Sequence, residues 1–216
     1  MKIVAINGSP KASGSTSAKI IGQVEKIMGE QIEVYRAAKL VSADTSRDII
    51  AGMLDADVLM LVFPLYVDSL HASLIELLKR IEISANNRAN LPRVYTIVNC
   101  GFFESSQTAL ALEIVEHFAN RAGLPWGYGL GVGGGPILSG LGESWEKGPA
   151  AIVHQALLAL SAAMRENRSG QNAFVSPKFP RFLYKAMGNY GFRYEARRNK
   201  IRNLRLQPYK EKPYTF

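Results

Sequence analysis

The chain has 216 residues, of which 47% are hydrophobic and 20% charged, and it carries a single cysteine. This composition is typical of a globular protein with one sizeable core, and the lone cysteine excludes an internal disulfide and any four-cysteine iron–sulfur or zinc site. The net charge of +8 is unevenly spread: residues 1–176 hold 15 Lys and Arg against 16 Asp and Glu, whereas residues 177–216 hold 11 against 2. An argument about acidic partners therefore concerns only the C-terminal segment.

Signals for export or membrane insertion are not expected. Strand-like residues begin at Lys2 without a basic region or cleavage site before them. Apolar runs stay shorter than the roughly 18 residues that a membrane-spanning helix needs. We therefore expect a cytoplasmic protein.

Strand-like and helix-like segments alternate along the chain. Apolar runs predict strands at Lys2–Asn7, Ile32–Ala37, Val58–Phe63, Val94–Asn99 and Tyr128–Val132. Helical spacing of apolar residues predicts helices near Ser15–Met28, Ser46–Leu54, Leu70–Ile83, Ser105–Ala122 and Ala150–Met164. This order predicts an α/β fold with a doubly wound, five-stranded parallel sheet over residues 1–170, followed by a basic C-terminal helical extension over residues 171–216.

Ligands of such sheets bind beyond the carboxyl ends of the strands, which directs attention to the loops after the first, third and fourth strands. The first loop is rich in hydroxyl side chains, which come from Ser9, Ser15, Thr16 and Ser17. Hydroxyls and backbone N–H groups at a helix N-terminus make an anion site. The spacing from Gly8 to Gly14 fits neither a nucleoside triphosphate loop nor a dinucleotide fingerprint. We expect a phosphate monoester here; the structural alternative is a serine-rich helix cap.

A Gly-x-Gly-x-x-Gly match also occurs at Gly129, Gly131 and Gly134. It lies inside or after the fifth predicted strand, and we expect no helix to begin after it. We therefore do not interpret it as a dinucleotide site.

The run Asn7-Gly8-Ser9-Pro10, with Ser15-Thr16 further on, resembles the opening of the NADPH-dependent FMN reductase family of flavodoxin-like proteins. In that family this loop surrounds the 5′-phosphate of FMN. The resemblance implies that Ser9, Lys11 and the hydroxyl cluster Ser15-Thr16-Ser17 bind this phosphate.

The second loop, Pro64-Leu65-Tyr66-Val67, is similar to the family segment that borders the isoalloxazine ring. Tyr66 offers a flat face for the ring, or alternatively packs against the next helix. His71 stands where relatives commonly have proline; it either titrates near the ring or starts the helix.

The third loop, Asn99-Cys100-Gly101-Phe102-Phe103, resembles the family's third flavin loop. Two consecutive aromatic residues at a strand exit favour a planar ligand or a subunit partner nearby. For Cys100 we favour a small buried thiol that fills space over a redox role.

The resemblance implies an FMN-dependent oxidoreductase that takes electrons from NADPH or NADH and passes them to a small acceptor, such as a quinone, a nitro or azo compound, or free flavin. In flavin enzymes the cofactor performs the hydride chemistry, so we predict no catalytic side chain and no metal site. The alternative is a flavodoxin-like electron carrier, an FMN-binding protein without its own nicotinamide site. Phe102, Phe103 and Trp126, together with the resemblance, predict a homodimer.

The C-terminal segment has two open interpretations. Phe179, Phe182, Leu183, Met187 and Tyr190 recur at helical spacing and predict an amphipathic helix over 180–190 that docks on its own or a neighbouring domain. Residues 193–202 are densely cationic. They would associate weakly with an anionic membrane, or form a solvated arm that reaches across a dimer. We recognise no base-reading module and expect no specific nucleic acid partner.

Overall fold

The computed structural model describes residues 1–42 and 46–200. The chain divides into two compact units, Met1–Lys178 and a C-terminal unit that begins at Phe179. Each unit is described by itself below.

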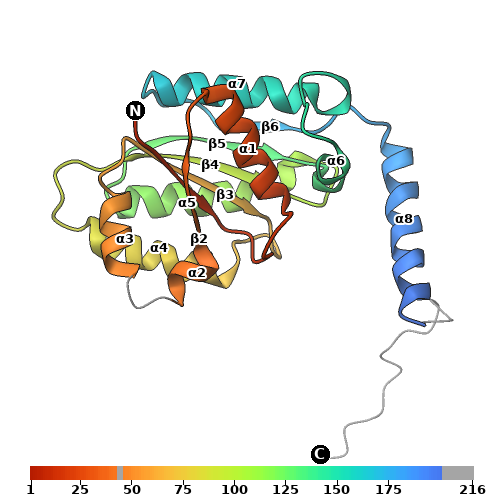
Figure 1. The fold of residues 1–216 in the computed structure, drawn as a ribbon, viewed down its shortest axis with the longest axis horizontal. Helices are drawn as coiled ribbons and strands as arrows, with labels where there is room; N and C mark the ends of the chain where they lie inside the picture. The colour runs from red at the N-terminus through yellow and green to blue at the C-terminus, as the bar shows by residue number, and fades with distance from the viewer. Residues whose placement is uncertain (43–45, 201–216) are drawn as a thin grey trace, which may run out of the picture. The chain divides into compact units, whose positions relative to one another are not determined.

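The first unit contains a six-stranded, wholly parallel sheet with strand order β2-β1-β3-β4-β5-β6 (Figure 1). The strands are β1 (Ile3–Asn7), β2 (Glu33–Arg36), β3 (Val58–Pro64), β4 (Arg93–Asn99), β5 (Trp126–Val132) and β6 (Ala173–Val175). The predicted doubly wound α/β class is confirmed. The predicted count of five strands is wrong, because β6 pairs with β5 at the sheet edge. With three residues, β6 is too short for a sequence pattern to reveal it.

The helices between the strands follow the predicted order. They are α1 (Thr16–Met28), α2 (Ala37–Val41), α3 (Ser46–Met53), α4 (Ala72–Ala85), α5 (Ala109–Arg121), α6 (Gly135–Gly140), α7 (Ala151–Arg165) and the short 3-10 turns η1 (Ser105–Thr108) and η2 (Gly148–Ala150). The short helices α2 and α6 are additions to the prediction, since five or six residues are too few to show a helical period.

Two helical layers enclose the sheet: α1 and α7 cover one face, and α2 to α5 cover the other (Figure 1). Alternate residues of each strand enter the two cores, so Val4 and Ile6 pack on the α4 side while Ile3 and Ala5 pack on the α1 side. Every residue of β1 is buried, as expected for a central strand covered on both faces.

The strand order reverses at β1, which lies between β2 and β3. Because all strands run parallel, the loops after β1, β3 and β4 all leave the sheet at the carboxyl ends of the strands. The register places Pro64 beside Asn99 and Asn7 beside Val62, so these exits are neighbours. The fold thus gathers the three loops singled out from the sequence.

The C-terminal unit contains one helix, α8 (Arg181–Arg198), within its described residues. The predicted start near Pro180 is confirmed, since Pro180 is the residue before the helix. The predicted end at Tyr190 is wrong: the helix continues through Gly191, because an interior glycine costs a helix only about 1 kcal/mol and does not terminate it. Residues 201 and 202 of the predicted cationic run lie outside the described residues. Among the described helices, none is both long and apolar enough to cross a membrane.

Candidate functional site

A cleft of about 520 Å³ opens at the carboxyl edge of the sheet, beside the point where the strand order reverses. Four segments supply its lining: Ser9, Lys11, Ser15, Thr16, Ser17, Pro64, Leu65, Tyr66, Asn99, Cys100, Gly101, Gly135, Pro136 and Ser139. Its volume is that of a site for a small molecule or cofactor. The first three segments are the three loops predicted from the sequence.

Three residues predicted to contact the cofactor are not part of this lining: Val67, Phe102 and Phe103. The Val67 side chain is 97% exposed, and Phe102 is exposed as well. Phe103 is half-buried, and its carbonyl accepts a hydrogen bond from Ser176 Oγ at 2.6 Å. The structure thus places these three outside the cleft walls.

The start of α1 presents hydrogen-bond donors to the cleft. Ser15 is the N-cap, and its Oγ accepts from the Ala18 N–H at 3.1 Å. Ser9 Oγ likewise accepts from the Lys11 N–H at 3.3 Å. Because both hydroxyl oxygens act as acceptors in these bonds, their own O–H groups remain available to donate. Together with the first N–H groups of α1 and the positive end of its dipole, they form a site suited to an anion.

Gly8 closes the turn between β1 and this cradle. A Cβ at this position would lie 2.7 Å from Phe63 Cβ and 2.8 Å from Leu74 Cδ2. The Gly8 N–H also donates to the Val62 carbonyl at 2.9 Å. A larger residue would therefore push the loop away from the sheet edge.

Asn99 connects the three loops. Its buried Nδ2 donates to Ser17 Oγ at 2.9 Å and to the Phe63 carbonyl at 3.0 Å. Both amide hydrogens are thereby used within the protein. The geometry favours a role in holding Ser17 and the exit of β3 in place, with direct ligand contact left to Oδ1.

The fourth segment, at the start of α6, is absent from the sequence prediction. The expectation that no helix follows the glycine-rich run was wrong, because α6 begins at Gly135. The Gly135 N–H donates to the Cys100 carbonyl at 2.9 Å, and a Cβ on Gly135 would lie 2.9 Å from that oxygen. The sequence did contain one indication of this fourth segment: the glycine-rich run lies at the carboxyl end of a predicted strand, where ligands of such sheets bind.

Helix α1 holds this fourth segment through side chains at helical spacing. Thr16 Oγ1 lies 2.6 Å from Ser139 Oγ, and Lys19 Nζ donates to the carbonyls of Ser139 (2.5 Å) and Leu141 (2.9 Å). Positions three and four residues apart share one helix face, so this arrangement follows from the geometry of α1.

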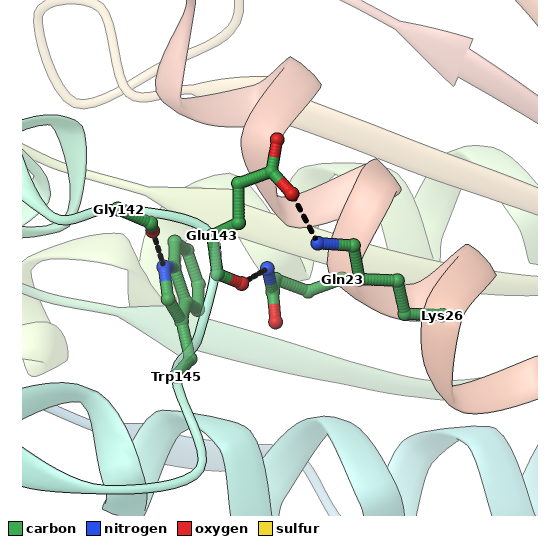
Figure 2. Close-up of polar contacts among 5 residues, drawn as sticks. All are labelled: Gln23, Lys26, Gly142, Glu143 and Trp145. Carbon is green, nitrogen blue, oxygen red and sulfur yellow. Dashed lines mark hydrogen bonds and ion pairs between the residues drawn. The ribbon is translucent and has the colours of Figure 1, made fainter.

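The contacts continue one and two turns further along α1, as Figure 2 shows. Gln23 Nε2 donates to the Glu143 carbonyl at 2.7 Å, and Lys26 pairs with the Glu143 carboxylate at 3.0 Å. In the same view the Trp145 indole donates to the Gly142 carbonyl at 3.2 Å. Trp145 is fully buried, as expected for a packing residue. The chain that follows α6 is thereby held to α1 as far as Glu143.

The opposite side of the cleft begins with a tight turn after β3. Tyr66 and Ser69 exchange two backbone hydrogen bonds of 2.9 Å, and the two residues between them, Val67 and Asp68, have φ of 46° and 57°. Positive φ at both central residues is typical of two-residue hairpin turns, which prefer asparagine and glycine there. A β-branched valine in this conformation is strained.

The rings of Tyr66 and His71 meet edge to face, with centroids 5.4 Å apart. His71 is the N-cap of α4, and its Nδ1 accepts from the Ser73 N–H at 3.3 Å. The expectation that His71 starts this helix is confirmed.

Cys100 is buried at the floor of the third loop, with its Sγ 3.6 Å from the Phe102 carbonyl. Burial is the main cause that raises the pKa of its thiol above the usual value. A protonated, buried thiol is a poor nucleophile, which agrees with a packing role. No group of three metal-ligating side chains occurs among the described residues.

Comparison with known proteins shows which fold this architecture represents. No family model and no curated protein sequence matches the chain. Among solved structures, an NADH:FMN oxidoreductase (EMOB, apo form) aligns with a TM-score of 0.57 at 16% identity, covering 78% of this chain and 90% of its own. The TIGR4 flavodoxin of Streptococcus pneumonia aligns with a TM-score of 0.52 at 12% identity, covering 76% and 99%. The chain has the flavodoxin-like fold.

A further structural neighbour is the NAD(P)H:quinone oxidoreductase from Methanothermobacter marburgensis. It aligns with a TM-score of 0.53 at 13% identity, covering 78% of this chain and 96% of its own. At these identities the likeness is one of fold, and the candidate site rests on the residues described above.

Proposed function

We propose that the flavodoxin-like unit binds FMN in this cleft and catalyses NAD(P)H-dependent reduction of a small acceptor. The observation that carries the proposal is the donor cradle at the start of α1, which opens into a cofactor-sized cleft at the reversal of the strand order. Two structural neighbours bear the names of an NADH:FMN and an NAD(P)H:quinone oxidoreductase, which supports this reaction class.

The cleft residues fit the phosphate end of FMN. The O–H groups of Ser9 and Ser15 and the first N–H groups of α1 are donors suited to a phosphate dianion. Lys11 lines the same end and adds a positive charge. Its carbonyl accepts from Arg36 Nη2 at 2.7 Å, which fixes the loop that carries it.

The cleft residues also fit a planar ring system. Pro64, Leu65 and Tyr66 provide an apolar wall, and the backbone around Cys100 and Gly101 provides the facing edge. Bound FMN would accept a hydride from the nicotinamide and pass electrons to the acceptor. The side chains of this protein would bind the cofactor, orient its ring and exclude water from it. We propose no catalytic side chain.

The physiological acceptor belongs to one of three chemical classes under this proposal: a quinone, a nitro or azo compound, or free flavin. Steady-state oxidation of NADH and of NADPH by the FMN-loaded protein, with one representative of each class, tests this directly. We expect turnover that depends on both the nicotinamide and the acceptor.

The second candidate is a flavodoxin-like electron carrier, favoured by the likeness to a flavodoxin across 99% of that chain. A carrier would bind FMN yet oxidise neither nicotinamide in the absence of a separate reductase. FMN binding without turnover would therefore replace the enzyme proposal with this one.

We also propose a homodimer. Two of the aromatic residues that predicted it, Phe102 and Trp126, differ in their position. Phe102 is exposed just beyond the carboxyl end of β4, whereas Trp126 is the first residue of β5 and packs against the core. Parallel strands all begin at one end of the sheet and finish at the other. Phe102 and Trp126 therefore lie at opposite ends of the sheet and cannot both belong to one small patch. Phe102 is therefore the better candidate for the dimer interface. Sedimentation at micromolar concentration tests whether the dimer forms. The cytoplasmic location stays a prediction.

A further inference from the structure

Helix α8 combines cations and large apolar side chains at unusual density. Its 18 residues contain one acidic side chain, Glu195. The basic residues are Arg181, Lys185, Arg193, Arg197 and Arg198. The aromatic residues are Phe182, Tyr184, Tyr190, Phe192 and Tyr194. The first unit, by contrast, is nearly neutral, so the charge of α8 is a property of this segment alone.

The apolar side chains of α8 are open to solvent. Leu183, Met187, Tyr190 and Tyr194 follow one another at intervals of four, three and four residues and therefore share one helix face. Their exposed fractions lie between 40% and 72%. Neighbouring apolar side chains that are exposed and bordered by cations often mark an interaction site.

A second α8 does not suit this surface. Pairing two copies along the apolar face would bring ten cationic side chains together with two acidic ones to offset them. Coiled-coil pairs are instead specified by acidic and basic residues that face each other beside the seam. An occupant that carries negative charge and also accepts apolar side chains complements this face better.

We propose that α8 docks on the surface of an anionic lipid bilayer. In this arrangement the four side chains of the apolar face enter the interfacial region, while the Lys and Arg stems extend along it and hold their charges at the lipid headgroups. Aromatic rings with a polar tip, such as those of Tyr190 and Tyr194, favour this boundary between apolar and wet surroundings.

The helix itself gains from such a surface. Gly188 and Gly191 lie in its interior, where glycine weakens a helix in water. Among the described residues of α8, Ala196 alone is buried. A bilayer that covers the apolar face supplies the stabilisation that helix propensity does not. This proposal is independent of the flavin-binding proposal, since it uses none of the cleft residues.

The test is flotation of the full-length protein with vesicles of phosphatidylcholine, alone or mixed with phosphatidylserine. We expect binding to the mixed vesicles at low salt, little binding to phosphatidylcholine alone, and release as added salt screens the charges. A variant with Tyr190→Trp, which places the new indole on the apolar face, should show a blue shift of its added fluorescence on binding, and quenching by brominated lipid.

Matched variants separate α8 from general charge. The triple variant Lys185→Gln, Arg193→Gln, Arg197→Gln should lower the partition coefficient about 100-fold, at roughly fivefold per cation. The control, Lys39→Gln, Lys79→Gln, Lys147→Gln, removes the same charge from exposed positions of the first unit and should leave binding unchanged.

Three outcomes would overturn the proposal. Equal loss in both triple variants would assign binding to net charge and not to α8. Tighter binding of the full chain to single-stranded RNA or duplex DNA than to the mixed vesicles would make nucleic acid the partner. Absence of binding to the mixed vesicles at low salt would remove the lipid surface altogether.

Discussion

The two sides of the cleft are built in contrasting ways. On one side, α1 holds the α6 segment by hydrogen bonds and an ion pair from Thr16, Lys19, Gln23 and Lys26. On the other side, the turn at Val67 is held by two backbone hydrogen bonds and carries an exposed side chain in a strained conformation.

This contrast suits a ligand with two unlike ends. A phosphate needs donors at fixed positions, because hydrogen bonds depend strongly on distance and angle. A planar ring has to be accessible to a nicotinamide and to an acceptor as well. A loop whose conformation can change suits that requirement better than a fixed wall.

The fixed side depends on close packing at Gly8. We expect Gly8→Val to lower the free energy of unfolding by about 3 kcal/mol, because its side chain would overlap Phe63 and Leu74. The matched control is Gly22→Ala, where a Cβ meets no atom within 4 Å. It should raise stability by about 0.5–1 kcal/mol through helix propensity. Urea unfolding of both variants measures the difference, and equal effects would contradict the packing argument.

The phosphate contacts come next. Ser9→Ala combined with Ser15→Ala should weaken FMN binding by about 1–3 kcal/mol, because hydrogen bonds to a charged group are lost. Riboflavin lacks the phosphate and serves as the internal control. Its affinity should be the same for the parent protein and the double variant. An equal loss for both flavins would place the phosphate elsewhere in the cleft.

The sequence pointed to part of the lining on this side of the cleft. A cluster of hydroxyl side chains just before a helical pattern is recognisable from the local sequence, so Ser15 and Thr16 could be predicted as cleft residues directly. Ser139 could not, because its place in the cleft follows from the contacts with Thr16 and Lys19 across more than a hundred residues. The sixth strand was missed for a similar reason, since its three residues form a strand only by pairing with β5.

On the other side of the cleft, two of the residues singled out from the sequence do not line it. Val67 and Phe102 were expected in the cleft because they follow the right strands, yet neighbours in sequence can point to different surroundings. The turn conformation at Val67, which directs its side chain into solvent, cannot be read from a sequence that lacks the usual asparagine and glycine.

The strained turn gives the third prediction. Val67→Asn with Asp68→Gly should raise the free energy of unfolding by about 1 kcal/mol, because both residues tolerate positive φ. Ile83→Asn is the control: it removes another exposed apolar side chain, in a helix of ordinary conformation, and should change stability little. A stabilisation shared by both variants would point to surface polarity and not to relief of strain.

The smallest effect is expected at Cys100. Cys100→Ala should alter FMN affinity and turnover less than about threefold, because the buried, protonated thiol takes no part in the reaction. Its raised pKa means that the native state holds this proton more tightly than the unfolded chain. The thiol's contribution to stability is therefore complete below the unfolded-state pKa and lost as the pH rises through the native value. Alkylation at pH 8 should be slower in the native than in the urea-unfolded protein, and equal rates would show an accessible thiolate.

Fluorescence titration of the purified apoprotein with FMN measures flavin binding in the cleft itself. We expect quenching of flavin fluorescence that saturates at one FMN per chain, with an affinity well above that for riboflavin. Flavin fluorescence that stays unchanged in the presence of excess folded protein would show that the cleft does not bind FMN.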